Sequence, residues 1–222
     1  MHACSLVMIL LAQLTPTTTA PSTQHAMTLD LTTPQAAAKS LFKAVAAGDR
    51  DAVRSTLFAD DAAQRDLIDA MADLIINGKH LGDAAKQQFG QAGDPIGRGM
   101  LDPNDLTRLD NAVVNETGDS ATVAIPESGR PRPMTFKKQN GQWKLIVTDF
   151  AAAAPANIAR QTHLIRLMAD AMEASAQEVA SGKYKPPDAA VGAIQRRLHE
   201  VMLIFTKPAT TRATSGPATN PL

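Results

Sequence analysis

The sequence predicts an α+β fold in which N-terminal helices pack on a curved antiparallel sheet, followed by a C-terminal helical hairpin and a disordered tail. Residues 112–150 alternate apolar and polar side chains, as half-buried strands do. The segments before and after them place apolar residues three and four positions apart, as amphipathic helices do. Residues 208–222 are rich in Thr, Ala, Pro and Ser and cannot build a core, so we expect a disordered tail there.

Residues 1–20 are predicted to be a signal peptide. Residues 5–14 are nearly all apolar but too few to span a bilayer, and the small residues 17–20 that follow are typical of a cleavage site. The segment before the apolar run has no Lys or Arg, so an ordinary frayed N-terminus is the alternative. We therefore expect an exported protein, periplasmic or secreted, with a flexible linker over residues 21–33.

Two short helices are expected to open the main domain. Thr33 can cap the first helix with its hydroxyl, and Pro34 suits the first helical position because its missing N–H is harmless there. Gly48 is expected to end this helix and Asp49 to cap the second. The pattern predicts a helix, a tight turn and a second helix.

A third helix is expected to begin at Asp60 or Asp61 and to end at Asn77 and Gly78. Its inward face would carry Leu67, Met71, Leu74 and Ile75. A separate, weaker helix is expected over residues 81–89, then a loose glycine-rich loop over residues 90–99 and one helical turn over residues 104–109.

The sheet is predicted to be a four-strand antiparallel meander made of two hairpins. Asn140 and Gly141 tolerate positive φ and predict a two-residue type I′ turn, which fixes the register of the second hairpin. The core face then carries Met134, Phe136, Trp143, Leu145 and Val147. On the other face Lys137 lies opposite Lys144, which is unfavourable unless an acidic group lies near. The first hairpin turns at Gly118 and Asp119 and pairs Val114 with Val123.

Two helices are expected after the sheet, over residues 155–181 and 188–205. The first would turn Leu164, Leu167, Met168, Ala171 and Met172 inward. The second carries a stripe of Val191, Ile194, Leu198, Val201 and Phe205, with Asp188 as its cap. Because the connection over residues 182–187 is short, we expect an antiparallel hairpin. The alternative leaves the stripe exposed for another envelope protein or for a homodimer through the C-terminal helices.

Three stretches carry a resemblance to a known family. Pro34 to Leu57, with Ala47-Gly48-Asp49 between two helices, Gly118 to Val123, and Asn140 to Leu145 resemble the nuclear transport factor 2-like (cystatin-like α+β cone) superfamily. The resemblance covers residues 34–150, with residues 151–207 as a helical hairpin extension and residues 208–222 as the tail. Activity varies widely in this superfamily, which includes isomerases, dehydratases, hydrolases and non-enzymatic binding or assembly domains. The chain has no obvious strand between its second and third helices, where the family pattern has one.

Composition excludes some partners. The 22 basic and 22 acidic side chains give zero formal net charge, so no global field draws nucleic acid or an anionic membrane. Aromatic residues make up 4% of the chain, which leaves little surface for stacking bases or sugars. We expect no nucleic-acid partner and no stable membrane span in the mature chain. The Asp-rich residues 60–110 and the basic residues 130–144 are expected to face each other or share a surface.

Asp66, Asp69 and Asp73 fall on one arc of the third predicted helix and raise the question of a metal site. No His or Glu completes the cluster, and a helix cannot wrap a calcium ion, so we favour a solvated face with Arg65 pairing Asp69. The loop over residues 90–99 lacks a phosphate-loop ending, and residues 102–105 read as a turn and helix cap rather than a calcium loop. No metal or cofactor is expected.

The family's enzymes use a pocket His and Asp as acid and base, and this resemblance makes His80 and Asp83 the candidate pair. An exposed pair at a helix start is the interpretation we favour. The candidates for lining a ligand pocket are Met71, Leu74, Met134, Phe136, Trp143 and Leu145. The leading hypothesis is an exported, non-enzymatic binding or assembly domain for an unidentified protein or a small apolar ligand. The alternative is a small cone-fold isomerase or hydrolase that uses His80 and Asp83.

Overall fold

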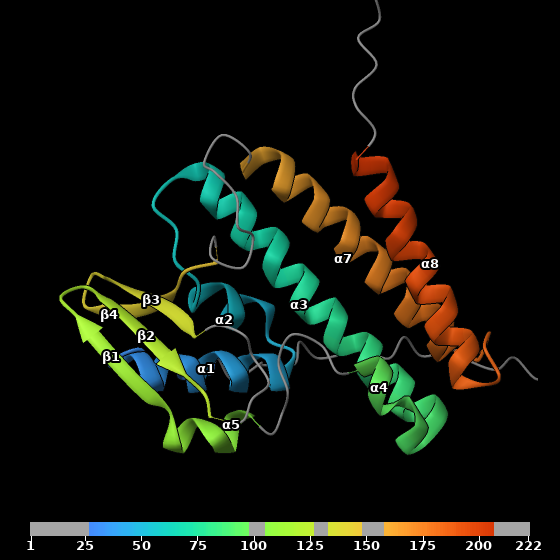
Figure 1. Cartoon of the computed structure of the whole chain (residues 1–222), viewed down its shortest axis with the longest axis horizontal. Helices are drawn as coiled ribbons and strands as arrows, with labels where there is room; N and C mark the ends of the chain where they lie inside the picture. Colours follow the sequence, from blue (N-terminus) through green and yellow to red (C-terminus); the bar gives the residue numbers. More distant parts are fainter. Residues whose placement is uncertain (1–26, 98–104, 127–132, 148–157, 207–222) are drawn as a thin grey trace, which may run out of the picture.

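The computed structural model describes residues 27–97, 105–126, 133–147 and 158–206. Helices come first, a four-strand antiparallel sheet follows, and two long helices close the described chain, which confirms the predicted α+β class (Figure 1). Several predictions fall outside the described residues: the signal peptide, residues 98–99 of the glycine-rich loop, residues 102–104, residues 130–132 of the basic stretch, the start of the helix expected at residue 155, and the C-terminal tail.

The two opening helices form as predicted. In α1 (Pro34–Ala47) the Thr33 hydroxyl accepts a hydrogen bond from the Ala36 N–H at 3.1 Å. Gly48 ends the helix with φ of 71°, a left-handed conformation that glycine adopts without steric cost. Asp49 then caps α2 (Arg50–Ser55) by accepting from the Ala52 N–H at 2.9 Å. The caps and the turn of this unit therefore follow from local chemistry.

Helix α3 (Ala62–Phe89) runs without a break, so the predicted end at Gly78 and the separate helix over residues 81–89 are wrong. Its N-terminus is capped by Asp61, as expected. A glycine inside a helix costs only about 1 kcal/mol. Helix α7 lies along α3 and offsets that cost, and the Asn77 side chain donates to the Ala169 carbonyl of α7 at 3.0 Å (Figure 1).

Residues 90–97 are ordered into a 3-10 turn, η1 (Gly90–Gly93), and one turn of helix, α4 (Asp94–Gly97), rather than the expected loose loop. Gly93 presses against α3 so closely that a Cβ there would lie 2.3 Å from the Ala85 carbonyl oxygen. Only glycine fits this contact. The turn over residues 104–109 is borne out by α5 (Asp105–Arg108) and η2 (Leu109–Asn111).

The sheet is the predicted meander, with strand order β1 (Val113–Thr117), β2 (Ser120–Ala124), β3 (Met134–Gln139) and β4 (Gln142–Leu145). Asn140 and Gly141 have φ of 53° and 79°, as a type I′ turn requires. Phe136 therefore pairs with Leu145, Lys138 with Trp143, and Val114 with Val123, as predicted. Lys137 lies opposite Lys144, and Asp60 supplies the acidic neighbour, 3.8 Å from the Lys137 Nζ.

The outer edge of β4 is closed by the chain itself. The Trp143 N–H donates to the Leu31 carbonyl, and the Leu145 N–H donates to the Thr56 carbonyl, both at 2.8 Å. Leu57 forms a parallel β-bridge with Leu145. A strand-like segment therefore lies between α2 and α3, where the sequence showed no obvious strand. Leu31, within the segment expected to be a flexible linker, is buried in the core.

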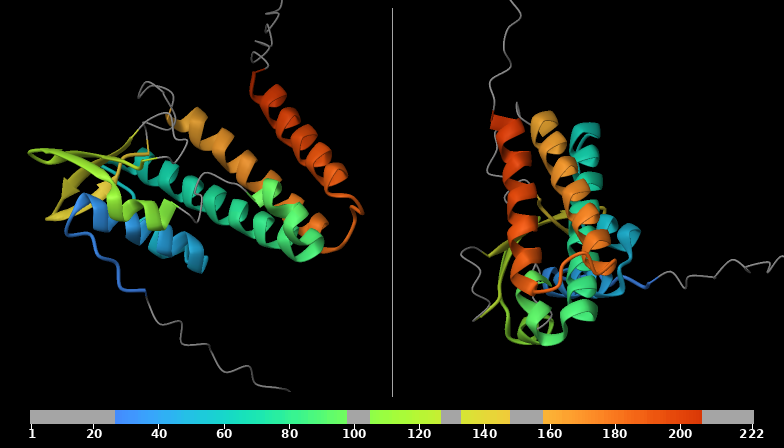
Figure 2. Two further views of the ribbon diagram at one scale, coloured as in Figure 1. Left: turned by 60° about the horizontal axis from the view of Figure 1, so that its bottom comes forward. Right: turned by 90° about the vertical axis from the view of Figure 1, so that its right-hand side faces the viewer.

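The last two helices form the predicted antiparallel hairpin, α7 (Ile158–Ala180) and α8 (Pro187–Thr206) (Figure 2). Gly182, with φ of 71°, ends α7. Helix α8 begins at Pro187, so Asp188 lies in its first turn and is not the cap that was expected. Ile194 and Val201 of the predicted stripe are buried, which confirms packing within the chain.

The predicted inward face of α7 is correct in part: Ala171 is buried, and Met168 and Met172 pack against the main cluster. Leu164 and Leu167 are only partly buried, and neither belongs to a core cluster. The closely packed positions hold mostly small side chains, because α7 lies close against α3: Ala169, Ala171, Ser175 and Ala176. A prediction from the spacing of large apolar residues does not detect a buried helix face that is made mainly of Ala and Ser.

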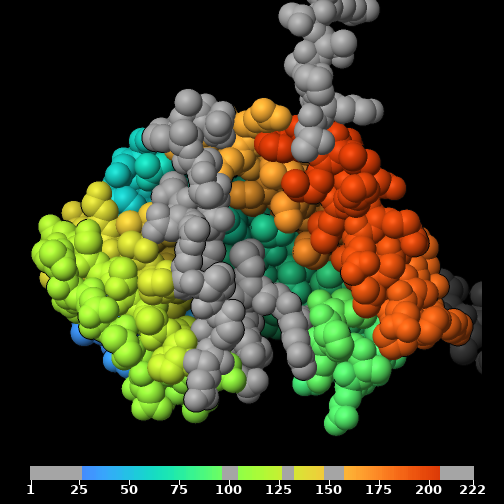
Figure 3. All heavy atoms as spheres, viewed as in Figure 1, coloured from blue at the N-terminus to red at the C-terminus, as the bar shows by residue number. Residues whose placement is uncertain are grey.

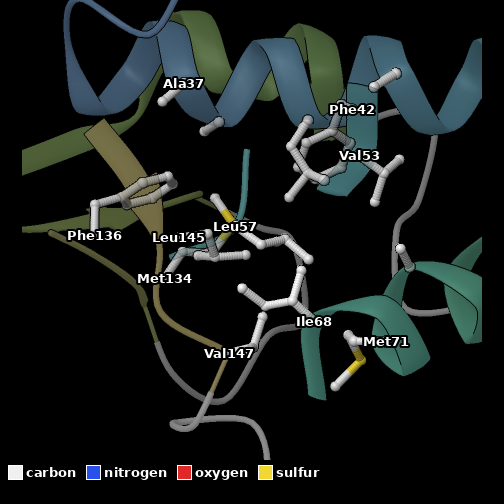
Figure 4. Packing of buried hydrophobic residues seen from close by; sticks show 14 of the residues in the cluster. Ala37, Phe42, Val53, Leu57, Ile68, Met71, Met134, Phe136, Leu145 and Val147 are labelled. Atoms are coloured by element: carbon white, nitrogen blue, oxygen red, sulfur yellow. The ribbon is translucent and has the colours of Figure 1, made fainter. Parts of the chain in front are cut away.

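Buried apolar residues form a main cluster and a smaller one. The main cluster joins the sheet to α1, α2, the first half of α3 and the first half of α7 (Figure 4). The smaller cluster joins the second half of α3 to the α7–α8 corner through Leu81, Ala85, Val179 and Ile194. Since α7 contributes Ile158 and Ile165 to the main cluster, it is part of the same packed body as the sheet.

Candidate functional site

The residues proposed to line a ligand pocket lie in the main core. Met71, Leu74, Met134, Phe136, Trp143 and Leu145 are each at most 7% exposed. Figure 4 shows Phe136, Met134 and Leu145 of the sheet gathered beneath α1, with Met71 on the neighbouring turns of α3. These side chains fill the space between the sheet and the helices. A ligand at this position would have to displace core side chains, which makes binding there costly.

His80 and Asp83 make separate contacts on the exposed surface of α3. The His80 Nδ1 lies 3.7 Å from the Glu173 Oε2 on α7, and the His80 side chain is 50% exposed. Asp83 forms an ion pair with Lys79 one turn earlier. Both residues lie beside Leu81 of the smaller core cluster, away from the sheet interior. Their spacing of three residues on a helix predicted a His-Asp pair, but His80 contacts Glu173 and Asp83 contacts Lys79.

Two carboxylates of the acidic arc of α3, Asp69 and Asp73, pair with α2. Arg54 Nε lies 2.6 Å from Asp69 Oδ1, and Arg50 binds both carboxylate oxygens of Asp73. The expected pairing of Asp69 with Arg65 is therefore wrong. The hydrogen bond to Asp73 is the main cause of a raised Arg50 pKa. These contacts fix the short α2 against α3, which is a structural role.

A second charged network, which the sequence reasoning missed, fastens the α7–α8 corner. Glu178 accepts hydrogen bonds from Lys183 Nζ and Tyr184 Oη, both at 2.6 Å, and Arg197 Nη2 lies 2.9 Å away. Arg197 also donates to the Ser175 hydroxyl at 2.8 Å. These bonds, that from Lys183 first, lower the pKa of Glu178 to about 2. The sequence signal that could have predicted this network is the closeness of Glu178, Gly182, Lys183 and Tyr184, which fall within seven residues.

Among the described residues, one carboxylate is buried. Asp105, at the start of α5, is 1% exposed, and Arg108 Nη1 lies 3.1 Å from its Oδ1. From the sequence, Asp105 was expected to end a turn and helix cap over residues 102–105. Its ion pair with Arg108, one turn later in the chain, meets the requirement that a buried charge be paired.

Large apolar side chains are exposed at two places in the described chain. Met202, Leu203 and Ile204 are 42%, 49% and 65% exposed at the C-terminal end of α8, and Val113 is 55% exposed on β1. Figure 3 shows the α8 surface and the β1–β2 hairpin at opposite sides of the molecule. Consecutive residues point about 100° apart on a helix, so Met202, Leu203 and Ile204 surround the end of α8, where exposed apolar area is a candidate contact surface.

Other classes of site receive no support from the described residues. Within the described ranges, no three His, Cys, Asp or Glu side chains are placed to hold a metal ion. None of the helices described there combines the length and apolar character needed to cross a bilayer. Comparison with family models, with curated proteins and with solved structures finds no match to this chain.

Proposed function

We propose that this chain is an exported, non-enzymatic domain that binds a protein partner through its surface. The filled interior carries the proposal: the six residues expected to line a cone pocket pack against one another in the main core. An enzyme of the cone type needs polar groups inside an apolar pocket. Here His80 and Asp83 are paired with Glu173 and Lys79 at the surface instead.

The end of α8 is a suitable contact surface because it is held in place. Arg160 of α7 donates to the Phe205 carbonyl at 2.8 Å, and its guanidinium lies 4.5 Å from the centre of the Phe205 ring. This contact satisfies a carbonyl in the last turn of α8. The exposed Met202 and Ile204 therefore stand on an ordered helix end, and a partner binding there would lose little entropy in ordering them.

The resemblance to the nuclear transport factor 2-like superfamily is consistent with this proposal, since that superfamily includes binding and assembly domains. The order of two short helices, a long helix and a meander agrees with the resemblance. The strand-like segment at Leu57 lies where the family pattern has a strand. Export rests on the apolar run over residues 5–14.

The test is site-specific photo-crosslinking in the organism that makes the protein. A photoreactive residue at Ile204 is expected to give one discrete adduct with a second protein in the exported fraction. The matched control places it at Gln195, an exposed polar position on the same helix. The proposal fails if Ile204 gives no adduct beyond the Gln195 background. A hydrolase or isomerase activity that His80→Ala abolishes would establish the enzyme alternative instead.

A further inference from the structure

We propose that the open edge of β1 pairs antiparallel with β1 of a second copy of this chain. The two edges of the sheet differ. The outer edge of β4 is bonded to Leu31, Thr56 and Phe58. In the described part of the chain, no backbone hydrogen bond reaches the outer edge of β1. This inference concerns self-association and stands whether or not a different protein binds at α8.

The register of the first hairpin shows which backbone groups are available. Thr117 pairs with Ser120 across the two-residue turn, so Thr117, Asn115 and Val113 direct their N–H and C=O groups toward β2. The groups of Val114 and Glu116, which alternate with them, therefore point away from the sheet. Within the described ranges, these two residues present unbonded donors and acceptors along the edge.

The edge lacks several of the features that prevent strand pairing. Natural edge strands are blunted by charged side chains, Lys above all, by Pro, by bulges or by a covering segment. Residues 113–117 contain neither Pro nor Lys, carry the single charge of Glu116, and pair with β2 through five successive residues without a bulge. Val113 is 55% exposed there. Figure 3 shows the β1–β2 hairpin at the surface of the molecule.

One register satisfies the free groups and keeps like charges apart. With the twofold axis at Asn115, Val114 of each copy exchanges hydrogen bonds with Glu116 of the other. An axis at Glu116 would set two carboxylates opposite each other, which is destabilising. An axis at Val114 would use the Ala112 N–H, which already donates to the Leu109 carbonyl at 3.2 Å. The edge is therefore self-complementary about Asn115, as a closed twofold contact requires.

Side chains agree with this register. The two Asn115 residues would form a non-hydrogen-bonded pair, with Cα atoms about 4.5 Å apart. An amide carries both a donor and an acceptor, so two facing Asn side chains can bond to each other. Val113 would face Thr117 of the second copy, which covers part of its exposed surface.

Cysteine crosslinking of the purified full chain tests both the contact and its register. Cys4, the one native cysteine, is replaced by Ser, and Asn115→Cys is compared with Thr117→Cys. In the proposed register the Cα atoms at position 115 of the two copies fall within the disulfide range of about 4.4–6.8 Å. The two positions 117 would lie about 14 Å apart, because four residues at about 3.4 Å each separate them.

Asn115→Cys is expected to form disulfide-linked dimers roughly tenfold faster than Thr117→Cys, or more, because a standing contact raises the effective thiol concentration. Equal rates, or faster crosslinking at position 117, would overturn the proposal. Both positions are exposed, so both variants should unfold like the parent chain.

A charge substitution gives an independent readout in the same protein. Asn115→Lys would set two cations opposite each other at the axis and is expected to shift sedimentation toward the monomer. Thr117→Lys is the matched control, since it adds the same charge on the same face but faces Val113. A dimer equally populated in both variants, or absent from the parent chain at every concentration tested, would refute pairing at this edge.

Discussion

Replacing Gly78 by Ala tests whether α3 passes unbroken through its middle. Gly78 lies inside the helix, its φ is not positive, and no atom beyond its chain neighbours and the backbone of the adjacent helical turns lies within 4 Å of the position that a Cβ would occupy. The new methyl group therefore meets no clash. Ala is favoured over Gly in a helix interior by about 0.8–1 kcal/mol, partly through the unfolded chain. We expect the free energy of unfolding to rise by about 0.5–1 kcal/mol.

The matched control has the opposite sign. Gly48 has φ of 71°, so Gly48→Ala should lower the free energy of unfolding by about 1–2 kcal/mol. Denaturant titration measures both variants, followed by far-ultraviolet circular dichroism and by the fluorescence of Trp143, the single tryptophan. A loss of about 1 kcal/mol for Gly78→Ala would mean that the helix ends at Gly78, and would refute a continuous α3.

Three further predictions concern the core, the α7–α8 corner and export. Phe136→Ala should lower the free energy of unfolding by about 3–5 kcal/mol in denaturant titration, because Phe136 is fully buried. The control Gln142→Ala, at an exposed position, should lower it by about 0.5 kcal/mol or less. A loss below about 1 kcal/mol for Phe136→Ala would show that the hairpin register is wrong. Ionised Glu178 contributes stability above its ordinary pKa of 4.5, and this contribution is lost as pH falls through the folded pKa of about 2. Glu178→Gln should therefore reduce stability at neutral pH and flatten its fall in acid, and an acid unfolding curve unchanged from the parent would contradict the network's role. Protein recovered from the exported fraction should lack residues 1–20 by intact mass, and a full-length mass there would argue against cleavage.

Features set by neighbouring residues could be predicted from the sequence. The Thr33 cap, the Gly48 terminus and the Asn140-Gly141 turn each depend on the conformational preferences of one or two residues. The turn then determines which strand residues face the core, because side chains alternate along a strand. Trp143 is buried for that reason.

Features set by contacts between distant segments could not be predicted from the sequence. Gly78 lies inside α3 because α7 packs along that helix, and propensity alone gave a break there. Asp69 pairs with Arg54, which lies on another helix, whereas spacing pointed to Arg65 on its own helix. The candidate pocket followed the correct inward face of the sheet, but only the packing against α1 and α3 shows that this face is filled.

The closure of β4 limits how far the sheet can grow. In the described part of the chain, Leu31 and Thr56 occupy the backbone groups of that edge, so a new strand can be added only beside β1. If two copies join there about a twofold axis, each uses its single available edge and none is left for a third chain. Such association is self-limiting: it yields a continuous eight-strand sheet of two chains, twice the four strands of one, rather than a fibre.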